Sequence, residues 1–172
     1  MQLKKKLILI DCTKLKRTSG ISSRSLDGGT LFQEKNTYKI TRSTIKLVTK
    51  KESSEKTIND LIFAYKVAKH VKSNAIVFVN NKQTIGIGAG QMSRIDSTRV
   101  AIMKYKDFFK GRAFVCASDA FFPFTDNVKK LLNLKCKAII QPSGSKNDKK
   151  IIDYVKKHNS SLYFVKNRVF KH

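Results

Sequence analysis

The sequence predicts an α/β fold in which helices cover both faces of a mixed central sheet. Short apolar runs rich in β-branched residues, typical of buried strands, alternate with longer segments whose apolar residues recur at helical spacing. Strands that alternate with helices of this length indicate a sheet that is parallel in its later part. With 172 residues, of which 41% are hydrophobic, the chain is long enough for one cored domain.

The first 52 residues are polar and rich in turn-forming residues, and we expect them to form an N-terminal arm or linker. The stretch SGISSRSLDGG, residues 19–29, predicts a loop, and short strands are predicted near 7–10 and 45–49. A domain boundary is therefore expected after residue 52, with 53–172 as the compact part.

The compact part is predicted to begin with an amphipathic helix that ends near His70. Ser53 and Ser54 are candidate N-caps. The apolar residues that fall on one helical face are Ile58, Leu61, Ile62, Tyr65 and Ala68. Two strands, 75–79 and 83–88, follow and are separated by an Asn-Asn turn, so they are predicted to form a hairpin.

Helices and strands alternate in the remainder of the chain. Apolar spacing predicts helices within 96–106, after a cap at Asp126, and over about 147–158. Apolar β-branched runs predict strands at 113–117, 138–140 and 161–165.

Composition narrows the classes of function. Of the 36 basic residues, 29 are Lys and 7 are Arg, scattered along the chain, and the formal net charge is +24. Nucleic-acid readers rely on Arg for bidentate contacts, so dispersed Lys favours compositional drift in an AT-rich genome. Selected binding of a polyanion such as RNA stays open as the alternative.

Cysteine and histidine usage indicates neither a disulfide framework nor a metal site. Cys12, Cys116 and Cys136 are odd in number and lack C-x-x-C spacing, and the three His lack metal-ligand spacing. The apolar runs are far shorter than the roughly 20 residues that span a bilayer, and no secretory signal is recognisable. A cytoplasmic location without membrane contact is therefore expected.

Ligands of open α/β sheets bind beyond the carboxyl ends of the strands. That rule selects four loops of this chain: GAGQMSR, SDAFFPFTD, QPSGS and KNRVFKH. In the first, glycines let backbone amides approach an anion, with Arg94 beside them, although a plain glycine-rich turn fits equally well. In the second, three Phe around a Pro suit either a flat ring bounded by Asp119 and Asp126 or a plug in the core.

Taken together, these loops resemble a known family. VKSNAIVFVNNKQTIGIGAGQMSR, ASDAFFPFTDNV, IIQPSGS and the closing NRVFKH, in this order, closely resemble the C-terminal region of the AICAR transformylase part of the bifunctional AICAR transformylase/IMP cyclohydrolase. LDGGTLFQ and LVTKKESSEKTINDLIFAYKVAKHVKSN also fit that family. The resemblance implies a cytidine-deaminase-like three-layer α/β/α half-domain. It also implies formyl transfer from 10-formyltetrahydrofolate to AICAR, 5-aminoimidazole-4-carboxamide ribonucleotide, in purine biosynthesis.

The resemblance also implies two sets of site residues. The residues around the AICAR nucleotide would be Asn74, Arg94, Phe121 and Arg168. The residues facing the folate co-substrate would be Ile95, Asp126, Ser145 and Lys146. Asn74 would bond near the reacting amine, the two Arg would offer cationic donors, Phe121 would pack on a planar ring, and Asp126 would accept from the pterin.

The catalytic Lys-His pair of the family lies in an FKHVNPAG-like segment of the first half, which this sequence lacks. Lys69-His70 stands in a different context, AKHVKSN, so Asn74 is expected to have only a supporting catalytic role. We therefore expect the isolated chain to be inactive and to need a second polypeptide with the first half, a homodimer, or both.

Two alternatives stay open. The chain could be a non-catalytic remnant that binds nucleotide, folate or RNA, or a fragment of a longer enzyme. No metal is expected, and nucleic acid is not the expected partner.

Overall fold

The computed structural model describes residues 8, 10–14 and 20–171. The chain divides into two compact units, Met1–Thr37 and Tyr38–His172. The sequence placed the boundary after residue 52, whereas residues 38–52 lie in the second unit and contribute a strand and buried side chains to it.

The first unit contains an antiparallel hairpin where the sequence predicted a loop. Strand β1 (Ile21–Leu26) pairs with β2 (Gly29–Glu34) across a two-residue turn, Asp27-Gly28. Gly28 has φ 81°, a conformation that glycine adopts without a steric cost. Asp-Gly between such segments is a strong hairpin signal, which is why the loop prediction was wrong. The strand predicted at 7–10 is not formed at Ile8 or Ile10, and the other two positions lie outside the described residues.

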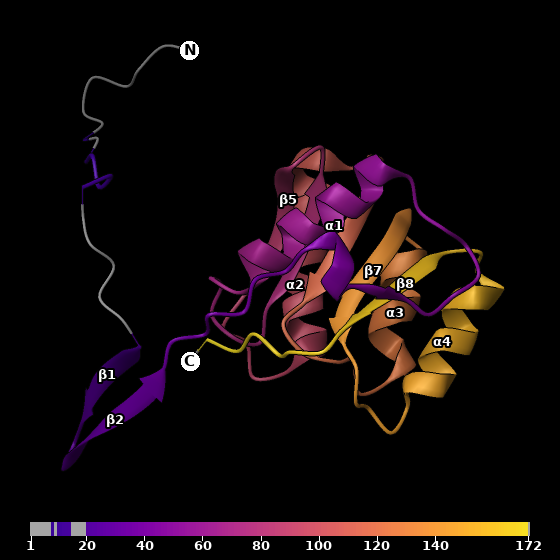
Figure 1. Cartoon of the computed structure of the whole chain (residues 1–172). Coiled ribbons are helices and arrows are strands. Elements are labelled where there is room, and N and C mark those ends of the chain that lie inside the picture. Colours follow the sequence, from indigo (N-terminus) through magenta and orange to yellow (C-terminus); the bar gives the residue numbers. More distant parts are fainter. Residues whose placement is uncertain (1–7, 9, 15–19, 172) are drawn as a thin grey trace. The chain divides into compact units, whose positions relative to one another are not determined.

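A mixed six-stranded sheet forms the middle layer of the second unit (Figure 1). Its order is β3-β8-β7-β6-β4-β5. The strands are β3 (Lys46–Leu47), β4 (Ile76–Asn80), β5 (Gln83–Gly88), β6 (Phe114–Ser118), β7 (Cys136–Pro142) and β8 (Ser161–Val165). Strands β6, β7 and β8 are parallel and the other pairings are antiparallel, so the predicted mixed sheet, parallel in its later part, is confirmed.

Helices cover both faces of this sheet. Helix α1 (Glu55–Ala68) packs on one face against β4, β6 and β7. Helices α2 (Arg94–Phe109), α3 (Thr125–Leu132) and α4 (Asp148–Lys157) enclose the second core on the other face. Alternate residues of the strands supply the two cores, as Val77 and Phe78 of β4 illustrate. The three-layer α/β/α arrangement expected of a cytidine-deaminase-like half-domain is thus observed.

Several element ends differ from the sequence-based expectation, each for a local reason. Ser54, not Ser53, caps α1, because its hydroxyl accepts from the Thr57 amide at 3.3 Å. Asp126 does not cap α3. The helix begins at Thr125, with Phe124 in the cap position, so Asp126 lies in the first turn. There the positive end of the helix dipole stabilises its negative charge.

The β4–β5 turn lies one residue later than predicted. Asn81 and Lys82 both have positive φ, 50° and 54°, which suits the right-handed twist of a hairpin. Their amides donate to the carboxylate of Asp60, at 3.0 and 2.8 Å. Because Asp60 belongs to α1 and is buried, it fastens this turn to the helix.

None of the helices formed by residues 8, 10–14 and 20–171 has the length and apolarity that crossing a bilayer requires. Cys116 and Cys136 are buried and Cys12 is exposed; none of the three forms a disulfide. Burial raises the pKa of both core thiols, so they remain protonated at neutral pH.

The close packing of α2 on β5 requires a residue without a side chain at Gly88. A Cβ at this position would lie 1.7 Å from the carbonyl oxygen of Ser97, a backbone atom that cannot move aside alone. We predict that Gly88→Ala lowers the free energy of unfolding by about 2–3 kcal/mol, the usual cost of overpacking or more. Urea unfolding followed by circular dichroism measures it. Gly29→Ala, where a Cβ meets nothing within 4 Å, is the matched control and should change little.

Candidate functional site

The sheet topology brings five segments to one edge. Strands β6, β7 and β8 are parallel, and β4 is antiparallel to both β5 and β6. The carboxyl ends of β5 to β8 therefore share an edge with the amino end of β4. The four loops selected from the sequence, the last as far as Lys171, and residues 73–75 before β4 meet there.

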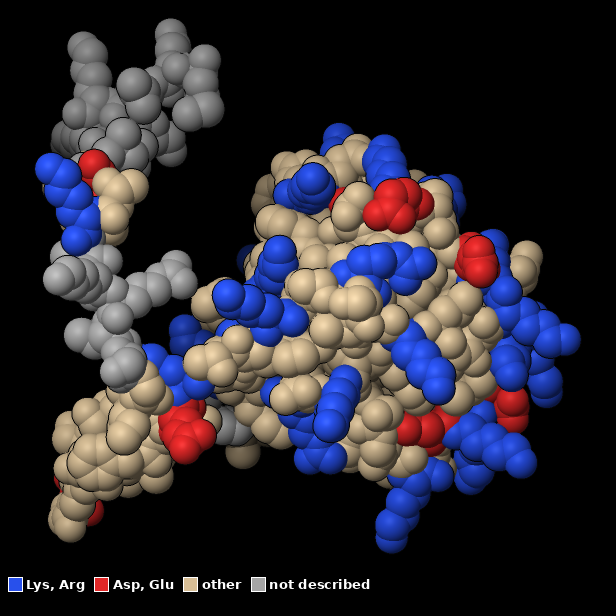
Figure 2. Space-filling view, viewed as in Figure 1, with Lys and Arg blue, Asp and Glu red and all other residues tan. Residues whose placement is uncertain are grey.

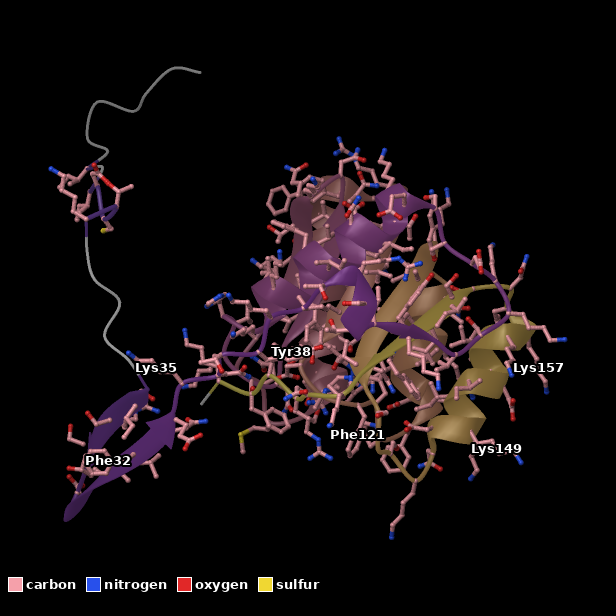
Figure 3. The ribbon with its side chains drawn as sticks, in the orientation of Figure 1. Phe32, Lys35, Tyr38, Phe121, Lys149 and Lys157 are labelled. Carbon is pink, nitrogen blue, oxygen red and sulfur yellow. The ribbon has the colours of Figure 1, made fainter. Side chains whose placement is uncertain are left out.

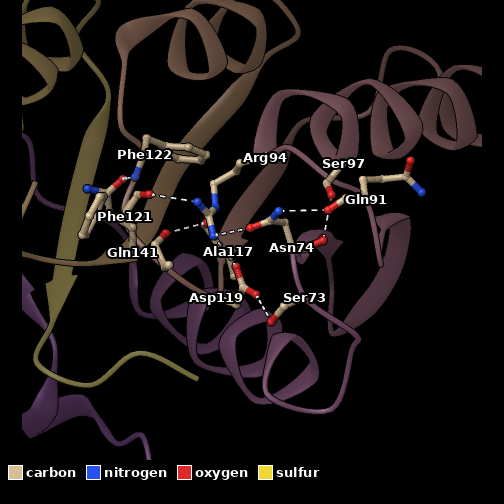
Figure 4. A network of polar contacts seen from close by, with 12 residues as sticks. Ser73, Asn74, Gln91, Arg94, Ser97, Ala117, Asp119, Phe121, Phe122 and Gln141 are labelled. Atoms are coloured by element: carbon tan, nitrogen blue, oxygen red, sulfur yellow. Dashed lines mark hydrogen bonds and ion pairs between the residues drawn. The ribbon is translucent and has the colours of Figure 1, made fainter. Parts of the chain in front are cut away.

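A buried ion pair lies at the centre of this edge (Figure 4). The Nη2 atom of Arg94, at the start of α2, is 3.0 Å from Oδ1 of Asp119, directly after β6. The Arg94 side chain is 11% exposed and that of Asp119 is fully buried. Burying either charge alone would be costly, so each holds the other in place.

Asp119 also joins the segment before β4 to the C-terminal tail. Its Oδ2 accepts from the hydroxyl of Ser73 at 2.6 Å, and its amide donates to the carbonyl of Ala75 at 3.2 Å. Its own carbonyl accepts from the amide of Val169 at 3.0 Å. One buried residue thus aligns three parts of the chain that are distant in sequence.

Asn74 is fixed in one orientation by the same network. Its Oδ1 accepts from Arg94 at 3.0 Å, and its Nδ2 donates to the carbonyls of Gln91 and Met92 at 2.9 and 3.3 Å. Both amide hydrogens are therefore used. A carbonyl oxygen has two lone pairs, so Oδ1 retains one for a further donor.

Phe121 and Arg168 form the more accessible part of the cluster. The guanidinium carbon of Arg168 lies 4.7 Å from the centroid of the Phe121 ring, and Arg168 is exposed. Arg94 Nη1 donates to the carbonyl of Phe121 at 3.3 Å and so anchors this loop. Figure 3 labels Phe121 among the side chains of this edge.

The core-plug interpretation of the Phe-rich loop is confirmed for one residue, and the flat-ring interpretation stays a prediction. Phe122 is fully buried in the second core, as the plug interpretation expected. Phe124 is 64% exposed and Phe121 is half-buried. Asp119, expected to border a flat ring, instead turns its carboxylate to Arg94 and Ser73.

The residues expected to face the folate lie in or directly before the first turns of three helices. Ile95 is in the first turn of α2, Asp126 is in the first turn of α3, and Ser145 and Lys146 precede α4. Asp126 and Lys146 are exposed. The segments are tied by hydrogen bonds from Thr98 Oγ1 to Asn127 Oδ1, 2.7 Å, and from Asn147 Nδ2 to the carbonyl of Pro123, 2.7 Å.

Tyr65 supports the tail that carries Arg168. Its hydroxyl donates to the carbonyl of Asn167 at 2.5 Å. Burial, above all, raises the pKa of Tyr65, and the nearby Tyr38 and Asp119 add to this. The phenol therefore stays protonated and keeps donating throughout the physiological pH range.

A separate cavity of about 570 Å³ lies at the opposite edge of the sheet, where β6, β7 and β8 begin. Lys51, Lys135 and His158 are among its lining residues. Its buried hydroxyls are already used, since Ser160 and Ser161 donate to backbone carbonyls at 2.8 Å. The convergent polar network is at the carboxyl edge, so we place the candidate site there. Among the described residues, no group of three or more His, Cys, Asp or Glu could hold a metal ion.

Comparison with known proteins identifies the family. The profile of the AICARFT/IMPCHase bienzyme family matches residues 1–104, more than half of the chain. This chain belongs to the AICARFT/IMPCHase bienzyme family. The bifunctional purine biosynthesis protein PurH of Buchnera aphidicola subsp. Schizaphis graminum is 43% identical over 175 residues, covering 100% of this chain and 33% of that protein.

Other relatives match in the same way. PurH of Oceanobacillus iheyensis is 44% identical over 86% of this chain and 29% of its own length. PurH of Persephonella marina is 42% identical over 91% and 30%. The chain thus spans about a third of the length of these AICARFT/IMPCHase relatives. Among solved structures, Acinetobacter baumannii RibD, form 2, is similar with a TM-score of 0.40 and 12% identity over 61% of this chain and 33% of that one.

Sequence reasoning missed the organising role of three residues of this site. Asp119 was read as a ligand contact, Ser73 was not considered, and Gln141, whose Oε1 accepts from the Phe122 amide at 3.2 Å, was only part of a loop. A buried acid placed directly after a core strand was the one available signal for Asp119. Its partners come from segments 25 and 46 residues away.

We predict that Asp119→Asn destabilises the second unit by about 3–5 kcal/mol, because it leaves the Arg94 charge buried without its counter-charge. Chemical unfolding followed by circular dichroism measures the loss. The exposed pair of Asp96 and Arg99, with Nη1 to Oδ1 at 2.7 Å, provides the control: Arg99→Gln removes only this surface pair and should change stability little. Equal effects of the two substitutions would contradict the organising role of Asp119.

Proposed function

We propose that this chain supplies part of an AICAR transformylase site, in which a formyl group passes from 10-formyltetrahydrofolate to AICAR during purine biosynthesis. The observation that carries the proposal is the cluster at the carboxyl edge. An exposed Arg168 lies against the Phe121 ring, beside an Asn74 amide that Arg94 holds in place. Membership of the AICARFT/IMPCHase bienzyme family supports the same assignment.

The nucleotide contacts divide into binding and organising roles. Arg168 is the exposed guanidinium of the cluster and suits the phosphate of AICAR, to which Arg can donate in bidentate fashion. Phe121 offers a ring face to the planar imidazole. Arg94 is already bonded to Asn74, Asp119 and Phe121, so we assign it the positioning of these groups rather than phosphate binding.

Asn74 would act on the reacting amine through the remaining lone pair of Oδ1. A hydrogen bond from the AICAR amine to this oxygen would turn the nitrogen lone pair toward the formyl carbon. The N–C bond to the formyl group forms, the bond from that carbon to N10 of the folate breaks, and the amine proton passes by way of a base to N10. An amide oxygen is too weak a base for this, so the role of Asn74 is supporting.

The described residues of the cluster do not supply that base. Asp119 is committed to Arg94 and Ser73. Lys69, which directly follows α1 and precedes His70, donates its Nζ to the carbonyl of Tyr38 at 2.9 Å. We therefore propose that a second polypeptide, with the family sequence that this chain lacks, completes the site.

On the folate side, Asp126 would accept hydrogen bonds from the amino edge of the pterin. Ile95 would pack on its ring, and Ser145 and Lys146 would contact its polar groups. Binding of RNA through the Lys excess is the alternative function. Figure 2 shows Lys and Arg dispersed over the visible face and mixed with acidic residues, which favours the small-molecule assignment.

Calorimetric titration of the full chain with AICAR, at low and high salt, tests the proposal. We predict that the affinity for AICAR falls at least about tenfold in Arg168→Ala and in Asn74→Ala. The first variant loses a charge-assisted contact and the second an oriented one. The matched controls are Arg112→Ala, which removes the same type of contact with the Phe109 ring 5.3 Å away, and Asn80→Ala, at the other end of β4. Both should bind AICAR as the unaltered chain does.

Equal losses in the controls, or no AICAR binding together with steeply salt-dependent RNA binding, would contradict the proposal. Formyl transfer is expected only when the missing part of the family sequence is added.

A further inference from the structure

The β1–β2 hairpin of the first unit carries exposed apolar side chains. All twelve strand residues are exposed. Among them, Ile21, Leu26, Leu31 and Phe32 are between 52% and 68% exposed. Figure 3 labels Phe32 on this hairpin. A two-stranded hairpin alone in water is marginally stable at best, so this one needs a surface to cover it.

The strand register places apolar side chains on both faces. Phe32 is opposite Ser23, and Ile21 lies two residues before Ser23, so Phe32 and Ile21 share one face. Leu31 is opposite Arg24, two residues before Leu26, so the two Leu share the other face. A hairpin that merely lay on a surface would need only one apolar face. Two apolar faces indicate insertion between two layers.

Lysine usage independently marks the hairpin as an interface. Residues 17–34 contain no Lys, in a chain that has 29. The other long Lys-free stretches, 83–103 and 111–128, hold core strands β5 and β6 and the site loops that follow them. Lys is therefore missing from two stretches that hold core strands and two of the site loops, and the hairpin shares this property although it is exposed. Depletion of Lys is typical of protein interfaces.

The family match and the net charge indicate which partner covers the hairpin. The profile match includes the hairpin, and about two thirds of the length of the relatives lies outside this chain. A second copy would bring together two chains of net charge +24, which opposes association. We propose that the hairpin docks, with both faces buried, into the polypeptide that carries the remaining part of the AICARFT/IMPCHase sequence; this partner assignment rests on the proposed function.

The test is co-expression of the tagged full chain with the part of the Buchnera aphidicola relative outside the matched segment. Affinity capture and light scattering should find a one-to-one complex. Phe32→Ser and Leu31→Ser, one on each face, should each weaken it about tenfold or more. Phe108→Ser and Met103→Ser remove comparably exposed apolar groups of α2 and should weaken it less than about twofold. Circular dichroism should show that the second unit of every variant melts as in the unaltered chain.

The inference is overturned by a complex that forms equally well with both hairpin variants, by sensitivity to only one face, by a homodimer that needs the hairpin, or by no complex at all. Formyl transfer separates this result from the proposed function. An active complex that the hairpin substitutions do not weaken contradicts only the inference about the hairpin. A complex that depends on the hairpin but shows no formyl transfer, and whose AICAR affinity is unchanged by Arg168→Ala, contradicts only the proposed function.

Discussion

The ion pair between Arg94 and Asp119 is the interaction on which the candidate site depends. Each charge is almost or fully buried, and neither would be tolerated there without the other. Through its remaining atoms the pair reaches the segment before β4, the Phe-rich loop and the C-terminal tail. Such a pair adds little net stability over well-packed apolar residues, but it permits few alternative arrangements of these segments.

The topology explains why this interaction can form at all. Because β4 runs against its neighbours, its amino end meets the carboxyl ends of β5 and β6. Asn74 therefore lies beside Arg94 and the loop of Phe121, although 20 and 47 residues separate them. Among the described residues of this cluster, the one buried carboxylate, that of Asp119, is bonded to Arg94 and Ser73. The chain spans about a third of its relatives' length.

Much of the fold could be predicted from the residues alone, because core strands and amphipathic helices leave strong periodic signals. The β1–β2 hairpin was missed because all of its strand residues are exposed, so its Ser-rich and Gly-rich segment looked like a loop. The cap of α3 was misplaced because an acidic residue favours both the cap and the first turn of a helix. The loops of the site could be selected from topology. The orientation of the Asp119 carboxylate toward Ser73 and Arg94 could not be predicted, because side-chain directions across three segments depend on the packing of the folded chain.

A double-mutant cycle over Arg94→Gln and Asp119→Asn tests the central claim most directly, with unfolding free energy and AICAR affinity as the two readouts. If the pair organises the site, the double variant should lose less stability than the sum of the single variants, with a coupling of about 2 kcal/mol or more. AICAR affinity should be as low in each single variant as in the double one. Stability losses that add within about 0.5 kcal/mol, or an AICAR affinity that none of the variants changes, would contradict the account.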